Sequence, residues 1–144
     1  MSTSIVKLAG KNGYSGYSGY SGYSGASTRI IEIRALHYTT DVAVGTTISG
    51  EFRIPVACTV VAVGAYVDTA GTTNSTVIDI NEGGVSILST KISIETGEKS
   101  SKDAAAQPVI SDSSIAADAI ITIDVDSIST TAPKGLTVWL QITI

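Results

Sequence analysis

The chain has 144 residues, and only 15% of them are charged, against about 25% in a typical domain. The net charge is −4 and the nine Lys and Arg residues are scattered, which argues against binding to the phosphate backbone of a nucleic acid. No run of 18 apolar residues is present, so the sequence predicts no membrane span.

Residues 1–9 form a short peptide whose apolar side chains are Ile5, Val6 and Leu8. The peptide lacks the long apolar core of a signal peptide, so we expect the protein to be made and assembled in a cytoplasm. Two interpretations stay open for this segment. It is either a docking peptide that binds another surface or a frayed terminus.

Residues 10–27 carry glycine at every third position without a slip: Gly10, Gly13, Gly16, Gly19, Gly22 and Gly25. A collagen-type triple helix requires this period, because only glycine fits at the axis where three extended chains meet. The outer triplets GKN and GAS keep the glycine although they lose the Tyr-Ser unit, which indicates a constraint on the backbone. We therefore expect a short collagen-like stalk that joins three chains.

The same period places four tyrosines on one stripe of each chain, as candidate interface residues: Tyr14, Tyr17, Tyr20 and Tyr23. Two other interpretations compete with the stalk. Gly/Ser-rich segments are often flexible linkers, and Tyr/Gly/Ser repeats also occur in low-complexity segments that associate. The triplets contain no proline, which would pre-set the φ angle of a triple helix.

Residues 28–144 show strand patterns throughout and no sustained 3.6-residue apolar period. Turn clusters at 68–75, 82–84 and 133–135 and a polar loop at 95–108 separate the predicted strands. These strands are 30–38, 46–54, 57–67, 76–81, 85–90, 109–110, 119–128 and 136–144. The pattern predicts an all-β domain, an antiparallel β-sandwich of jelly-roll type, in which the first and last strands are neighbours.

Few residues are candidates for a catalytic role. The single histidine, His37, lies among bulky strand residues, which is typical of a packed or interface residue. The single cysteine, Cys58, lies in an apolar run where a thiol is inert, and it excludes an intrachain disulfide. We predict no catalytic residue and no cofactor.

Carboxylates are the weak candidates for a metal site. Asp79 and Asn81 share one strand face, as do Asp124 and Asp126. If the two strands are neighbours, their oxygen atoms would converge in a way that suits Ca²⁺. A solvated sheet face explains the same spacing, because alternate residues of any strand share a face, and we therefore predict no metal.

Trp139 lies in the last predicted strand, between residues of opposite orientation. If Leu136, Val138 and Leu140 face the core, the indole lies on the opposite face. There it is a candidate anchor of a subunit interface, unless both faces of this strand are buried within one subunit.

A short peptide, collagen-like triplets and a β body follow one another, and this order resembles small structural proteins of tailed bacteriophages. The resemblance extends to the segments FRIPVACTV (52–60) and VDTAGTTNSTVIDIN (67–81). It implies a homotrimeric, non-enzymatic virion component at the virion surface, either a capsid decoration protein or a head fibre, with the major capsid protein or another virion protein as partner. Alternatives are a tail fibre or adhesin that binds host glycans, and an extracellular filament subunit.

Overall fold

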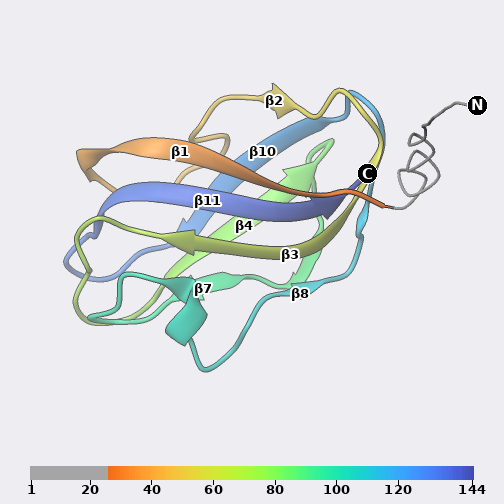
Figure 1. The fold of residues 1–144 in the computed structure, drawn as a ribbon. Helices are drawn as coiled ribbons and strands as arrows, with labels where there is room; N and C mark the ends of the chain where they lie inside the picture. Colours follow the sequence, from red (N-terminus) through yellow and green to blue (C-terminus); the bar gives the residue numbers. More distant parts are fainter. Residues whose placement is uncertain (1–25) are drawn as a thin grey trace, which may run out of the picture.

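The computed structural model describes residues 26–144, which form two packed antiparallel sheets (Figure 1). The predicted docking peptide and the glycine triplets up to Gly25 lie outside the described residues. Ser27 exchanges backbone hydrogen bonds with Ile144, of 3.1 Å and 3.0 Å. The β body therefore begins directly after the last triplet glycine, at the end of the sandwich where the chain also ends.

The first sheet has the strand order β1-β11-β3-β9 and contains the two longest strands. Its strands are β1 (Thr28–Asp41), β11 (Lys134–Thr143), β3 (Cys58–Tyr66) and β9 (Ser114–Ile115). β1 lies at the edge of this sheet, and only β11 pairs with it among the described residues.

The second sheet has the order β2-β10-β4-β5, and β7 also pairs with β4. Its strands are β2 (Phe52–Arg53), β10 (Ile120–Ser127), β4 (Thr76–Glu82), β5 (Val85–Ser86) and β7 (Ile92–Ile94). A small third sheet pairs β6 (Leu88–Thr90) with β8 (Val109–Ile110), beside the 3₁₀ turn η2 (Ser101–Asp103).

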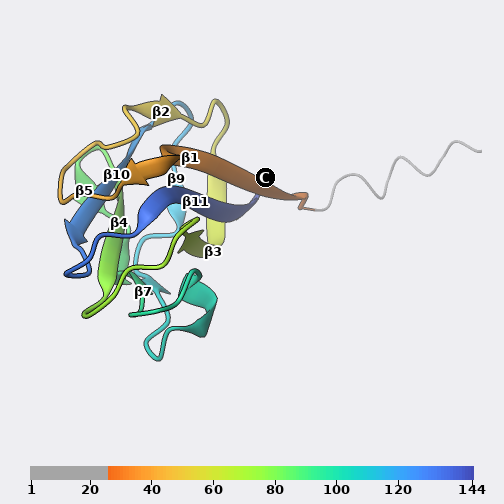
Figure 2. The ribbon, with the colours of Figure 1, turned by 90° about the vertical axis from the view of Figure 1, so that its left-hand side faces the viewer.

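Strands β1 to β4 alternate between the two sheets, and the last strand returns to lie between β1 and β3. This is the strand order of a jelly roll, in which two Greek keys are wound together. The predicted all-β sandwich is confirmed, as is the pairing of its first and last strands. Figure 2 shows β10 and β4 in one layer and β11 and β3 in the other.

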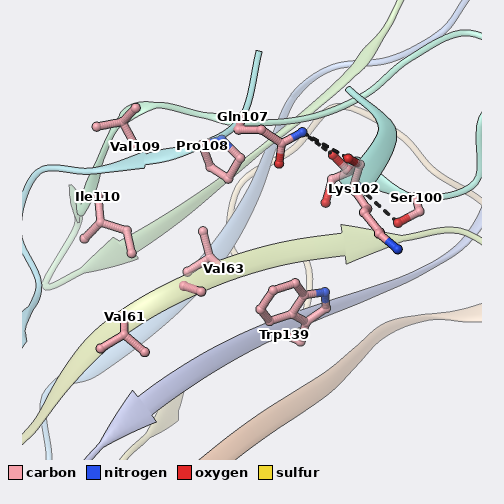
Figure 3. A pocket seen from close by; sticks show the side chains of 11 residues that line it. Val61, Val63, Ser100, Lys102, Gln107, Pro108, Val109, Ile110 and Trp139 are labelled. Atoms are coloured by element: carbon pink, nitrogen blue, oxygen red, sulfur yellow. Dashed lines mark hydrogen bonds between the residues drawn. The ribbon is translucent and has the colours of Figure 1, made fainter. Parts of the chain in front are cut away.

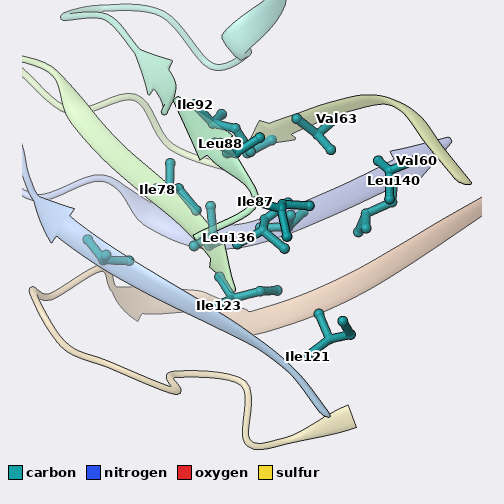
Figure 4. Close-up of a cluster of buried hydrophobic side chains, with 14 of the residues drawn as sticks. Val60, Val63, Ile78, Ile87, Leu88, Ile92, Ile121, Ile123, Leu136 and Leu140 are labelled. Carbon is teal, nitrogen blue, oxygen red and sulfur yellow. The ribbon is translucent and has the colours of Figure 1, made fainter. Parts of the chain in front are cut away.

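The core lies between the layers and follows the two-residue period of the strands (Figure 4). Ile121, Ile123 and Val125 of β10 are fully buried, on the face that their alternation predicts. From the opposite sheet, Leu136, Val138, Leu140 and Ile142 of β11 pack against them. Each such side chain contributes about 1.5–3 kcal/mol through removal from water.

Three predicted elements differ from the structure. Segment 46–54 is a strand only at β2, because Thr47 and Gly50 adopt φ angles of 52° and 74°, which extended backbone excludes. Segment 85–90 splits into β5 and β6 around Ile87. β11 already begins at Lys134, inside the predicted turn 133–135.

Within residues 26–144, no helix has the length and apolar character needed to cross a membrane.

Candidate functional site

The outer face of the β1-β11-β3 sheet carries Trp139. Leu136, Val138 and Leu140 point into the core, so the alternation of β11 places the indole on the opposite face, where it is partly exposed. In the cross-strand row, Trp139 lies between Glu32 of β1 and Gly64 of β3. Its proposed role as an interface anchor stays a prediction.

Gly64 allows the indole to lie directly on the backbone of β3. A Cβ atom at this position would be 2.5 Å from Cε2 and 2.7 Å from Nε1 of Trp139. Such distances are too short for real contacts, so any side chain here would displace the ring. The glycine therefore sets the position of Trp139.

Beside Trp139, a groove of about 730 Å³ runs along the outer side of β3 (Figure 3). One side is formed by Val61, Val63 and Trp139. The opposite side comes from the segment that contains η2 and β8, and it contributes Ser100, Ser101, Lys102, Gln107, Pro108, Val109 and Ile110. The groove is thus mainly apolar, with Lys102 as its charged side chain.

Hydrogen bonds hold the far wall of the groove in place. The Gln107 side-chain amide donates to the carbonyl oxygens of Ser101, Lys102 and Ala104, at 3.1, 3.2 and 2.7 Å. The buried Ser101 hydroxyl accepts a 3.0 Å bond from the Ala65 amide of β3. These bonds attach the wall to the sheet.

Large apolar side chains around this face are open to solvent. The exposed fractions are 46% for Val61, 51% for Val109 and 59% for Ile30 of β1. Apolar side chains gathered around a concave surface are typical of a site that another molecule covers.

The edge strand β1 is exposed along most of its length. Ile31 and Ile33 face the core but stay partly exposed, and Tyr38 is 58% exposed. The His37 ring lies 4.4 Å from the Tyr38 ring, and His37 Nδ1 lies 2.9 Å from Thr39 Oγ1. His37 is thus an exposed residue of the edge strand.

The carboxylates of the second sheet do come together, as the sequence suggested they would if their strands were neighbours. Asp79 and Asp124 are direct partners in the pairing of β4 with β10. Lys91 Nζ lies 2.9 Å from both Asp79 Oδ2 and Asp126 Oδ2, and the Asn81 amide donates to Asp124 Oδ2 at 2.9 Å. Lys91 therefore supplies, next to these carboxylate oxygens, the positive charge that a metal ion would otherwise supply.

Other hydrogen bonds use the remaining oxygens. Asp79 Oδ1 accepts from the Ser86 hydroxyl at 2.5 Å, and Asp124 Oδ1 accepts from the Thr47 amide at 2.8 Å. The hydrogen bonds to Asp126, which has the larger effect, and to Asp79 raise the pKa of the Lys91 amine. No group of three or more His, Cys, Asp or Glu residues among 26–144 is placed to hold a metal ion.

Cys58 is buried, and desolvation raises the pKa of its thiol. A raised pKa keeps the thiol in its protonated form near neutral pH, and this form is the poorer nucleophile.

Compared with protein-family models, curated proteins and solved structures, the chain matches none of them.

Sequence patterns did not indicate the groove. Its far wall comes from the predicted polar loop 95–108 and the short predicted strand 109–110, and nothing local shows that this segment folds back on β3. The one available signal was Gly64 in the middle of an apolar strand, because glycine in a strand marks close approach of another group.

Proposed function

We propose that the protein is a homotrimeric, non-enzymatic structural component of a virion, a capsid decoration protein or head fibre. Residues 10–27 join three chains, and the jelly-roll body stands at the virion surface. The observation that carries this proposal is the uninterrupted glycine triplet repeat, which leads within three residues into the exposed edge strand β1.

A stalk of six triplets without proline is weak by itself, so the bodies must also associate. The outer face described above suits this need. It presents partly exposed apolar side chains on the sheet that contains β1, which the stalk enters. Association would remove this apolar surface from water and keep the three glycine repeats in register.

Residues 1–9 bind the partner in this proposal, which is the major capsid protein or another virion protein. The stalk then holds the body away from the lattice. The low fraction of charged residues, 15%, limits electrostatic repulsion between closely spaced copies. No cofactor is required.

The solution mass of the full-length protein tests the proposal, and we expect three chains. Gly19→Val should lower the midpoint of thermal dissociation more than Tyr20→Val, because only glycine fits at the axis. Equal effects of the two substitutions would favour a linker, a single-chain mass would overturn the proposal, and polymers would favour a filament subunit.

A glycan-binding adhesin is the second candidate, and the open groove beside Trp139 favours it. An aromatic ring with polar neighbours such as Lys102 and Gln107 is a suitable platform for a sugar. Binding of the purified protein to a glycan array, lost in Trp139→Ala and kept in Tyr38→Ala, would support this function. No binding would leave the decoration protein as the better explanation.

A further inference from the structure

We infer that the three bodies associate head to tail, with the exposed edge strand β1 of one copy seated against the Trp139 groove of the next. This inference rests on the proposed trimer and adds to it the two surfaces that meet. The partner that fits the groove is therefore a second copy of this chain.

The stalk brings the three β1 strands together. Gly25 is the last triplet glycine, and β1 begins three residues later at Thr28. Three residues span at most about 10 Å, so Thr28 of every copy lies within that distance of the shared axis. The start of β1 is thus the part of the body that must lie near the other two copies.

Symmetry then decides what β1 contacts. Direct pairing of one β1 edge with another is a two-fold contact, which closes at two copies and leaves the third without a partner. A closed three-fold ring uses a heterologous contact, in which two different surfaces of each copy meet. The β1 edge must therefore contact another surface of its neighbour.

The Trp139 groove is the surface that fits. Val61 and Val109 are large apolar side chains that are both highly exposed and part of a concave surface. Val61 belongs to β3, in the same sheet as β1. Val85, the most exposed large apolar residue at 71%, belongs to the opposite sheet.

The strand register shows which residues lie at the same position along the strand direction, here called their height. Ile30, Gln141 and Ala62 form one cross-strand row, and Val61 is next to Ala62. In the proposed arrangement the three-fold axis runs along β1, so positions along this strand direction are unchanged by the rotation and Ile30 of one copy is level with Val61 of the next. The exposed Ile30 side chain then fills the apolar end of the groove.

Opposite charges also match two rows further along, on the same face of the sheet. Glu32 lies in the row of Trp139, and Lys102 lines the groove beside Trp139. Neither Glu32 nor Lys102 forms an ion pair within residues 26–144. In the head-to-tail arrangement Glu32 of one copy faces Lys102 of the next.

Disulfide trapping tests this contact. In full-length protein carrying Cys58→Ala, we combine Ile30→Cys with Val61→Cys, oxidise, and separate the chains on a denaturing gel without reductant. We expect a closed contact to give a dominant covalent band of three chains. Ile30→Cys with Val85→Cys is the matched control and should stay at one chain.

Solution mass of the same samples under reducing conditions separates the two proposals. A trimer that gives no cross-link between positions 30 and 61 overturns the head-to-tail contact and leaves the trimer intact. Cross-linked dimers from Ile30→Cys alone also overturn it, because β1 strands would then meet each other. A single-chain mass in the unmodified protein overturns both proposals.

Charge reversal provides a second measurement that needs no cysteine. Glu32→Lys and Lys102→Glu should each weaken the trimer at least about tenfold in dissociation constant, because each places like charges opposite one another. The double variant should return to within about twofold of the unmodified protein. Additive losses in the double variant would contradict the pairing.

Discussion

Gly64 shows how one residue without a side chain positions the largest side chain of the outer face. Gly64→Ala would place a methyl group 2.5 Å from Cε2 of Trp139, so the indole must leave β3. We expect a loss of about 1–3 kcal/mol in the free energy of unfolding, together with a shift in tryptophan emission.

Urea unfolding followed by the fluorescence of Trp139, the single tryptophan, measures both effects. Gly45→Ala is the control, because its added methyl group would meet Ile48 at an ordinary 3.5 Å. Equal losses in the two variants would show that the cost comes from glycine replacement in general and not from contact with the indole.

Lys91 neutralises a carboxylate that the fold buries. The Asp79 side chain is 5% exposed, whereas Lys91 is 36% exposed and joins Asp79 to Asp126. Lys91→Met should cost about 1–2 kcal/mol of unfolding free energy, less than for a fully buried pair because solvent screens Lys91. Lys134→Met, which breaks the exposed pair with Asp41, should cost well under about 1 kcal/mol in the same urea titration.

The same ion pairs make stability depend on alkaline pH. The pKa of Lys91 is raised above its ordinary 10.5 by bonds to Asp126 and Asp79. A raised pKa adds stability that is fully present below the unfolded value and is lost as pH rises toward the folded value. The stability difference between the unmodified protein and Lys91→Met should therefore be constant from neutral pH to about pH 10 and shrink above it. A difference that grows there would contradict the assigned contacts.

At the scale of elements, regular alternation is what made strands predictable. β10 and β11 have isoleucine, leucine or valine at every second position, and the buried face of both strands follows from the sequence, although β11 begins two residues earlier than predicted. The outward orientation of Trp139 follows from the same alternation. Neighbouring residues on one strand are enough for these predictions.

Elements that depend on distant contacts were not predictable. The segment before β2 alternates like a strand. However, the backbone amide of Thr47 donates a hydrogen bond to Asp124, which is far away in the chain, and the φ angle of Thr47, 52°, is incompatible with a strand. β6 leaves the hairpin of β4 and β5 to pair with β8, which also forms the wall of the groove. Half of the candidate site thus depends on a contact between segments that no local pattern records.

The start of β11 also depends on contacts with residues that are distant in the chain, and these contacts require a glycine. Gly135 has a φ of +69°, and a Cβ atom there would lie 2.9 Å from the Tyr38 backbone of β1 and overlap Asp68. Gly135→Ala therefore adds a steric clash to the cost of about 1–2 kcal/mol that a left-handed conformation imposes on alanine. The clash falls where β1 and β11 change register.

Gly97→Ala is the matched control, because Gly97 also has a positive φ of +77° but no atom within 4 Å of the added Cβ. We expect Gly135→Ala to lower the unfolding free energy by at least about 1 kcal/mol more than Gly97→Ala. Equal losses in thermal or urea unfolding would mean that the backbone conformation, and not the contact with β1, accounts for the effect.

At the scale of the whole molecule, the proposed function divides the chain into a part that trimerises and a part that attaches. In this proposal the triplets and the outer face hold three copies together, and Ile5, Val6 and Leu8 are the apolar side chains that dock. Three linked copies of a weak peptide bind far more tightly than one, because the second and third contacts are intramolecular. Attachment should therefore need both the peptide and the trimer.

Replacing Ile5, Val6 and Leu8 together with serine should abolish binding to purified virions that lack the protein, because the apolar contact is lost. The solution mass should stay at three chains, since the trimer contacts are elsewhere. Lys7→Ser, in the same peptide, is the control and should keep binding within about threefold in a co-sedimentation assay. Undiminished binding of the serine variant would move the attachment site from the peptide to the β body, and loss of the trimer would show that the peptide belongs to the assembly contacts.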